Sequence, residues 1–143
     1  MTPDERVFIA RHRVARLATA DTGGRPYVIP MCYALDDDVI YSALDLKPKR
    51  VEALNLKRVR NISENPSVAL VIDDYSEDWD TLAYVLVHGT ASLVLSKEEQ
   101  QQAERLLRDK YPQYESLLPQ GAPVLRIEIE RVKSWGAIEN RKG

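Results

Sequence analysis

Short turn-forming stretches between apolar, β-branched segments constrain the fold of this chain more than any other feature of its sequence. Thr22-Gly23-Gly24 and Asp36-Asp37-Asp38 each separate two such segments by only a few residues. Connections this short join antiparallel strands, because a parallel crossover needs a dozen or more residues. The sequence therefore predicts an antiparallel sheet built from hairpins.

Enrichment in β-branched and aromatic residues predicts six strands. They are residues Val14–Thr19, Tyr27–Leu35, Val39–Ala43, Val68–Asp73, Tyr84–Leu95 and Val124–Val132. In the last strand, apolar Leu125, Ile127 and Ile129 alternate with charged residues, which is the period of a sheet with one wet face. Gly89 interrupts the long fifth strand and predicts a bulge there.

Three helices are predicted between these strands. They cover about Pro3–Arg11, about Pro48–Ile62, and a segment that begins at Ser96 and stops at Pro112. Glu99 follows Ser96 by three residues, which is the spacing of a capping box. Six antiparallel strands with about three covering helices predict a mainly β fold, a small closed or split barrel, although periodicity alone leaves a sandwich open.

Length and composition describe an ordinary soluble protein. A chain of 143 residues with 44% hydrophobic and 29% charged residues predicts one domain spanning residues 1–143. No apolar run is long enough to span a bilayer and the N-terminus lacks a signal-peptide pattern, so we expect a cytoplasmic protein with no membrane contact.

The residues of common catalytic and metal sites are missing. Cys32 is the single cysteine and lies in an apolar run, where a thiol usually packs as a small hydrophobe. His12 and His88 are far apart and neither has a partner at metal-ligand spacing. The chain also lacks a nucleophile elbow, a Walker loop and a Gly-x-Gly-x-x-Gly motif. We therefore expect no metal site, and the sequence offers no evident catalytic nucleophile.

A local basic segment stands out in a chain whose net charge is -2. It holds six cations against the single acid Glu52, namely Lys47, Lys49, Arg50, Lys57, Arg58 and Arg60. Pro48 suits the first position of a helix, whose N-terminal N–H groups favour an anion. The segment is interpreted as a clamp for a small phosphate-bearing ligand rather than for nucleic acid. The alternative is a solvated surface helix, although Arg58 falls inside the apolar arc of that helix.

An acidic stretch, residues 73–80, follows the fourth predicted strand and contains two aromatic residues. Its five carboxylates are more typical of a solvated loop than of an acid–base pair. Trp79 within it must pack on something. The protein's own core, a partner subunit and a flat ligand all remain open.

The order of several short motifs resembles the pyridoxamine 5′-phosphate oxidase-like split barrels over nearly the whole chain. The motifs are Arg16-Leu17-Ala18-Thr19, Gly24-Arg25-Pro26-Tyr27-Val28-Ile29-Pro30-Met31, Ile40-Tyr41-Ser42, Lys47-Pro48-Lys49-Arg50, Arg60-Asn61-Ile62 and Asn65-Pro66. Together with the acidic stretch, the Lys-Pro-Lys-Arg run is similar to a subgroup predicted to use the deazaflavin coenzyme F420.

The resemblance implies a homodimer of six-stranded split barrels with a flavin or deazaflavin at the subunit interface. Lys47, Lys49 and Arg50 would hold its phosphate. The remaining expected cofactor contacts are the ring-lining Pro30, Met31 and Cys32, the ribityl-chain residues Tyr41 and Ser42, the tail-binding Lys57 and Arg58, and the partner-derived Trp79 and Trp135.

The function implied by this resemblance is hydride transfer between F420 and a small electron-poor organic substrate, with the cofactor carrying the chemistry. Because the C-terminus lacks a recognisable pyridoxal-phosphate site, vitamin B6 oxidation is not expected. An FMN-dependent oxidoreductase of the same fold is the alternative enzyme. A non-catalytic protein that binds a flavin, a deazaflavin or haem is the alternative from another class.

Overall fold

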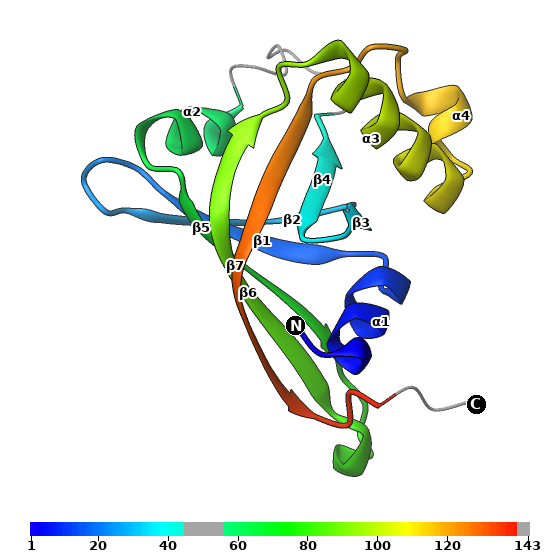
Figure 1. Cartoon of the computed structure of the whole chain (residues 1–143). Helices are drawn as coiled ribbons and strands as arrows, with labels where there is room; N and C mark the ends of the chain where they lie inside the picture. Colours follow the sequence, from blue (N-terminus) through cyan, green and yellow to red (C-terminus); the bar gives the residue numbers. More distant parts are fainter. Residues whose placement is uncertain (45–55, 140–143) are drawn as a thin grey trace.

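The computed structural model describes residues 1–44 and 56–139 of the chain. Within those ranges it has seven strands and four α-helices (Figure 1). The strands are β1 (Ala15–Ala20), β2 (Pro26–Met31), β3 (Ala34–Asp36), β4 (Val39–Ala43), β5 (Ser67–Asp74), β6 (Ala83–Leu93) and β7 (Val124–Gly136). The helices are α1 (Pro3–Arg11), α2 (Lys57–Glu64), α3 (Lys97–Lys110) and α4 (Tyr114–Leu117), with a 3-10 turn η2 (Trp79–Thr81).

All seven strands form one antiparallel sheet in the order β2-β1-β5-β6-β7-β4-β3. The sheet curls into a half-barrel around the core, and α3 and α4 lie beside its β3–β4 edge (Figure 1). Its two edge strands, β2 and β3, are consecutive in the chain and are separated only by Cys32 and Tyr33. The mainly β prediction is thus confirmed, whereas the predicted number of six strands is wrong.

The extra strand arises because the predicted segment Tyr27–Leu35 breaks at Cys32 and Tyr33. The Tyr33 side chain turns into the core, where it is fully buried and donates to the Ile9 carbonyl. The Tyr111 hydroxyl accepts from the Tyr33 N–H at 3.0 Å and lies 2.9 Å from the Tyr33 carbonyl oxygen. A side chain from α3's C-terminus therefore replaces the sheet hydrogen bonds that the chain gives up at this break.

The local turn predictions are confirmed. Antiparallel pairing joins β1 to β2 and β3 to β4 across the two short turns. The register between β6 and β7 shifts between His88 and Gly89, which is the predicted bulge. A Cβ atom at Gly89 would lie 2.4 Å from the Glu128 carbonyl oxygen, so the close approach of the two strands requires glycine there.

The helix predictions hold in part. Helix α1 has the predicted bounds, and α2 is described from Lys57, with Val59 and Ile62 buried. Ser96 caps α3 by accepting from the Glu99 N–H. The second hydrogen bond of a capping box, from the Ser96 N–H to the Glu99 carboxylate, is replaced, because that carboxylate instead accepts from Tyr41 and Arg126. This part of the prediction is wrong. Helix α4 was not predicted, since its four residues carry no recognisable helical period.

Strands β1, β5 and β6 alternate between buried and outward residues. Their inward side chains form the main core with Phe8 and Ile9 of α1. None of the helices in the two described ranges is both long and apolar enough to cross a membrane.

Candidate functional site

The outward side of β1, β5, β6 and β7 is an open sheet face, and cross-strand pairing fixes which residues lie on it. Paired residues point to the same side of a sheet, so each row across the strands shares one face. The three rows are Asp73–Tyr84–Trp135, Arg16–Val71–Leu86–Lys133 and Ala18–Ala69–His88–Arg131. Every residue in these rows belongs to a strand. We call this surface the open face.

The centre of the open face is a shallow, mostly apolar hollow. Its lining residues are Arg16, Val71, Asp73, Tyr84 and Leu86. The Arg16 guanidinium lies 3.1 Å from the Asp73 carboxylate, so these two charges largely offset one another. An antiparallel sheet that faces water normally alternates to polar side chains on that side. Val71 and Leu86 instead leave an apolar surface that suits a partner or a flat ligand.

Two tryptophans mark one end of this face. Trp135 stacks on its cross-strand partner Tyr84, with ring centroids 5.8 Å apart, and is 54% exposed. Trp79 stands in the loop between β5 and β6 and is 70% exposed. The loop and Gly136 lie at the same end, because Ala83 pairs with both Asp74 and Gly136. Of the three interpretations of Trp79, packing in the protein's own core is therefore wrong.

The predicted ring-lining residues point in three directions. Pro30 is exposed and pairs with Arg16, which places it at the β2 side of the open face. The Met31 side chain is buried in the main core. Cys32 is half-buried and packs into a second cluster beneath α3 and α4. Of these three side chains, only that of Pro30 is placed on the open face.

Tyr41 and Ser42 are both buried and their hydroxyls already have partners inside the chain. The Tyr41 hydroxyl donates to the Glu99 carboxylate at 2.6 Å. Burial, together with that hydrogen bond, raises the pKa of Tyr41 to about 12. The Ser42 hydroxyl donates to the Cys32 carbonyl at 2.8 Å. In this structure both side chains tie β4 to its neighbours.

The part of the predicted basic segment that the structure describes lies far from the tryptophans of the same chain. Lys57 is exposed at the start of α2, Arg58 is half-buried, and Lys47, Lys49 and Arg50 lie outside the described residues. Helix α2 packs near Leu93 at one end of β6, whereas Tyr84 is at the other end. Nine strand residues span roughly 30 Å. One chain therefore does not bring Lys57 and Trp135 to the same ligand ring.

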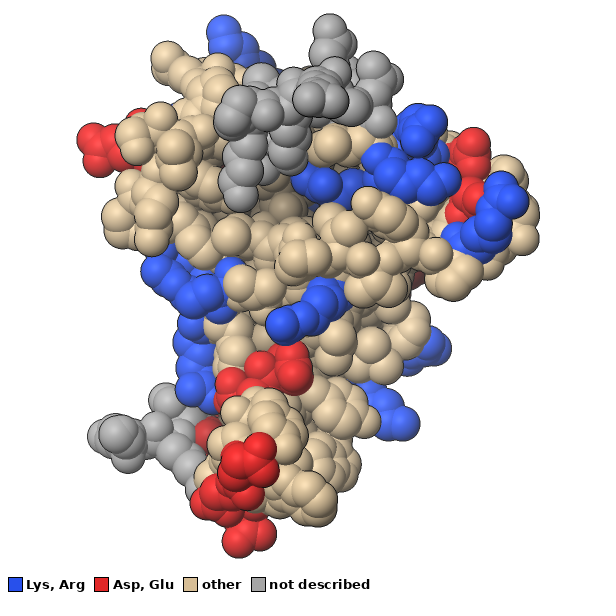
Figure 2. All heavy atoms as spheres, turned by 180° about the vertical axis from the view of Figure 1, so that it is seen from behind, with Lys and Arg blue, Asp and Glu red and all other residues tan. Residues whose placement is uncertain are grey.

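Charge is also divided along the molecule. Seen from behind, Asp and Glu side chains gather at the end that carries the β5–β6 loop, while Lys and Arg lie mainly over the remainder (Figure 2). Glu77, Asp78 and Asp80 are the exposed acids of that loop. An anionic group is thus disfavoured beside Trp79.

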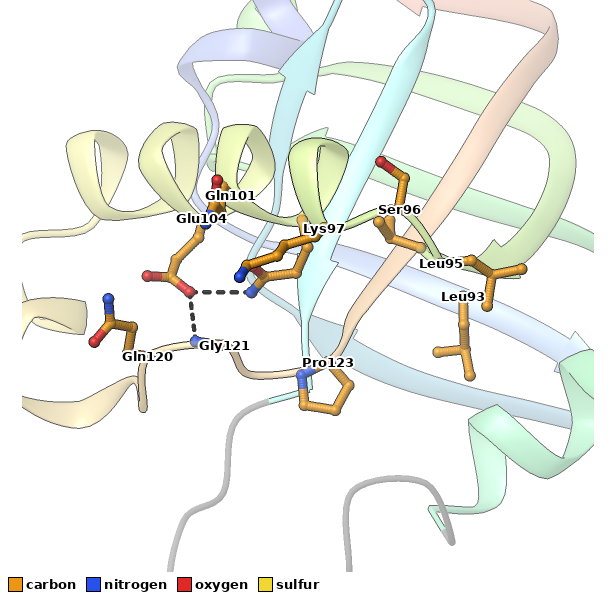
Figure 3. A pocket seen from close by; sticks show the side chains of 11 residues that line it. Leu93, Leu95, Ser96, Lys97, Gln101, Glu104, Gln120, Gly121 and Pro123 are labelled. Carbon is orange, nitrogen blue, oxygen red and sulfur yellow. Dashed lines mark hydrogen bonds between the residues drawn. The ribbon is translucent and has the colours of Figure 1, made fainter.

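A larger hollow, with a volume of about 780 Å³, lies elsewhere. It is bounded by the end of β6, the first half of α3 and residues 120–123 (Figure 3). The Glu104 carboxylate in its lining already accepts from Gln100, Gly121 and Arg108. None of the predicted site residues that the structure describes lines this hollow.

Sequence reasoning missed a buried lysine behind Cys32. The Lys110 ammonium lies 4.0 Å from the ring centroid of Tyr33 and 5.5 Å from that of Tyr111. Its nitrogen is shielded from solvent and has no hydrogen-bond partner among the described residues. Burial, with a smaller effect from Arg13, lowers the pKa of Lys110 to about 8. No sequence signal predicts this, because Lys110 simply ends an amphipathic helix.

The two histidines differ in their availability as ligands. His12 Nδ1 lies 2.7 Å from the Phe8 carbonyl oxygen and Nε2 lies 2.6 Å from an Asp74 carboxylate oxygen. Both nitrogens of His12 are thus engaged, which makes it a poor axial ligand for haem. His88 lies in the third row of the open face and is half-buried.

Comparison with known proteins assigns the family. Residues 1–136 match the model of the family described as pyridoxamine 5′-phosphate oxidase. The chain belongs to this family. The antiparallel half-barrel described above is thus the fold of a pyridoxamine 5′-phosphate oxidase-like protein.

Similar proteins include an enzyme and several solved structures. The chain is 28% identical over 139 residues to a 5a,11a-dehydrotetracycline/5a,11a-dehydrooxytetracycline reductase from Streptomyces rimosus, covering 94% of this chain and 82% of the relative. A conserved hypothetical protein, Rv2991 from Mycobacterium tuberculosis, superposes with a TM-score of 0.75 at 22% identity, covering 95% of this chain and 85% of that one. An FAD-binding protein from Mesorhizobium loti gives 0.70 at 21% identity, covering 94% of each chain.

Family membership and the reductase relative indicate a flavin-related oxidoreductase or binding protein. The residues present fit a flat ring in part. The open face supplies an apolar hollow, the exposed Pro30 and the stacked Tyr84–Trp135 pair. Of the cations expected to hold the charged part of the cofactor, the described residues include only Lys57 and Arg58, which lie at the opposite end of β6.

Proposed function

We propose that the protein is a homodimeric reductase that binds a deazaflavin or flavin, with F420 preferred, and passes a hydride to a small electron-poor organic substrate. The observation that carries the proposal is the apolar hollow of the open face beside the stacked Tyr84–Trp135 pair. A second subunit would cover the apolar surface, and its tryptophans would reach a ring held by the first.

Distance supports a site shared by two subunits. Lys57 and Trp135 are at opposite ends of the roughly 30 Å strand β6 in one chain. A two-fold interface between antiparallel sheets can place one end of a chain against the other end of its copy. The cations of one protomer and the aromatic residues of its partner would then meet around a single cofactor.

The cofactor would supply the hydride chemistry when bound, while the chain supplies position and electrostatics. The Tyr84–Trp135 stack offers a flat surface, and Pro30 borders the hollow without a backbone N–H of its own. Lys57, at the start of α2, would face the charged part of the cofactor. The reductase relative supports reduction as the direction of the reaction.

The test is a fluorescence titration of the purified protein with F420 and, in parallel, with FMN. We expect saturable binding with F420 preferred, because the basic segment suits a longer polyanionic tail better than a single phosphate. Trp135→Ala should weaken binding of either ring about tenfold, since a stacked aromatic contact contributes about 1 kcal/mol or more. Arg105→Ala, an exposed cation on α3, is the control.

The possible outcomes separate the competing functions. Preference for FMN would favour the alternative function, an FMN-dependent oxidoreductase of the same fold. Binding without turnover of reduced cofactor across a panel of enones and quinones would favour a storage or sensing protein. Binding of neither cofactor would contradict the proposal.

A further inference from the structure

Trp79 is exposed but firmly held. A tryptophan side chain stabilises a folded protein chiefly through the apolar area it buries, yet Trp79 keeps 70% of its surface in solvent. It occupies the 3-10 turn η2, where the Leu82 N–H donates to the Trp79 carbonyl at 3.4 Å. The stability of a single chain gives no reason to present this ring to water.

Two hydroxyl groups hold the turn together. The Ser76 and Thr81 oxygens lie 2.7 Å apart, and each lies 2.8 Å from the Asp78 carbonyl oxygen. One hydroxyl therefore donates to the other, which in turn donates to the carbonyl. The Asp78 carboxylate also accepts from the Asp80 N–H at 3.1 Å. This network encloses Trp79 between residues 76 and 81 and fixes its backbone.

Both ends of the loop are anchored to other elements. At the start, the Asp74 carboxylate lies 2.6 Å from His12 Nε2 and 3.7 Å from the Arg11 guanidinium. At the end, the Leu82 carbonyl accepts from the Ala137 N–H at 2.9 Å. The loop is thus tied to α1 on one side and to the chain after β7 on the other.

We infer that Ser76 and Thr81 are positioning residues that hold Trp79 ready to cover the ring of the cofactor bound by the partner subunit. This inference rests on the proposed function. The acids Glu77, Asp78 and Asp80 surround Trp79 and are exposed. A broad protein contact would bury these carboxylates at high cost, whereas a flat ring can lie on the indole face and leave them in water. A pre-ordered Trp79 also binds without the cost of ordering the loop.

The test uses Trp135→Phe as background, because Trp79 is then the single tryptophan of the chain. Cofactor binding is measured by equilibrium dialysis and, separately, by quenching of Trp79 emission. Thr81→Val keeps the shape of the side chain but removes the hydroxyl. We expect it to weaken cofactor binding about threefold to tenfold, since the loop must be ordered on binding. Quenching at saturation should also decrease.

Thr81→Ser restores a hydroxyl and should restore both affinity and quenching. Thr90→Val is the matched control, because Thr90 is an exposed threonine of β6 that bonds to Glu130 instead. Cofactor binding that leaves Trp79 emission unchanged would overturn the inference while sparing the proposed function. Equal affinity and quenching in Thr81→Val and its parent would overturn the positioning role. A chain that binds neither F420 nor FMN would overturn both proposals.

Discussion

At the scale of single residues, burial of the Lys110 ammonium is energetically costly. This group is enclosed by Tyr33 and Tyr111, and no hydrogen bond within the described part of the chain replaces the water it loses. Contact with the two rings offsets some of this cost. Burial lowers the pKa of Lys110 to about 8 from an ordinary value of 10.5. The folded state therefore binds fewer protons than the unfolded state between these two pH values.

We expect the free energy of unfolding to rise with pH from about 8 towards 10, because the unfolded chain keeps the Lys110 proton that the folded chain releases. Lys110→Met should remove this rise. It should also stabilise the protein at pH 7 by roughly 1–2 kcal/mol, less than the full pKa shift would give, since the lysine is partly exposed. Urea unfolding of both proteins at pH 7 and pH 9.5 measures the difference.

Lys97→Met is the control for Lys110→Met, because Lys97 is an exposed lysine on the same helix. Measurements stay below pH 10, since burial also raises the pKa of Tyr33, which removes stability once unfolded tyrosines ionise. A pH dependence that persists unchanged in Lys110→Met would contradict the assignment.

At the scale of elements, the end of β7 depends on a close backbone approach. Gly136 has a φ of +86°, and a Cβ atom added there would lie 2.1 Å from the Leu82 carbonyl oxygen. This glycine lets the end of β7 pack against the chain that enters β6, beside the stacked Trp135. The aromatic end of the open face therefore depends on a residue without a side chain.

Gly136→Ala should destabilise the protein by about 2 kcal/mol or more, because it combines an unfavourable φ with a collision against backbone. Gly121→Ala separates the two effects, since Gly121 has a φ of +77° but open space around its Cβ position. That variant should lose only about 1 kcal/mol. Thermal unfolding followed by tryptophan emission gives both values, and equal losses would contradict the collision.

Comparison of the predicted and observed elements shows which sequence patterns are sufficient to predict where a helix or strand begins and ends. Helix Pro3–Arg11 and strand Val39–Ala43 could be predicted to the residue, because turn residues and caps mark their ends. The break inside Tyr27–Leu35 could not, because it depends on the distant Tyr111 hydroxyl. Long-range contacts of this kind leave no mark on local periodicity.

At the scale of the whole molecule, the open face predicts a dimer. Leu86→Arg would place a charge in the centre of the apolar hollow. If two copies meet there, the variant should dissociate at least about tenfold more readily, because a buried unpaired charge is costly. Sedimentation equilibrium of wild type and variant measures this. Leu117→Arg on α4 is the matched control, since Leu117 is 62% exposed and lies away from this face.

A monomeric wild-type protein, or a Leu86→Arg dimer of unchanged affinity, would contradict this interface.

The candidate site could be predicted only as a set of residues, not as an arrangement. Resemblance named Pro30, Trp79 and Trp135, which the structure leaves exposed. It also named Met31 and Tyr41, whose side chains are buried here, because a motif cannot tell which side of a strand faces the core.

The two edge strands, β2 and β3, follow one another in the chain with only Cys32 and Tyr33 between them. This order of the strands determines when the protein can finish folding. Strands β1 to β4 leave the ribosome first, but β4 pairs only with β3 and β7, and β1 pairs with β2 and β5. The two N-terminal hairpins can form early and must then wait for β5, β6 and β7 to be inserted between them. Synthesis must reach Val124 and beyond before the gap can close. A nascent chain of this protein therefore exposes two unpaired strand edges through most of its translation, and its need for protection by chaperones should be greatest just before the last strand emerges.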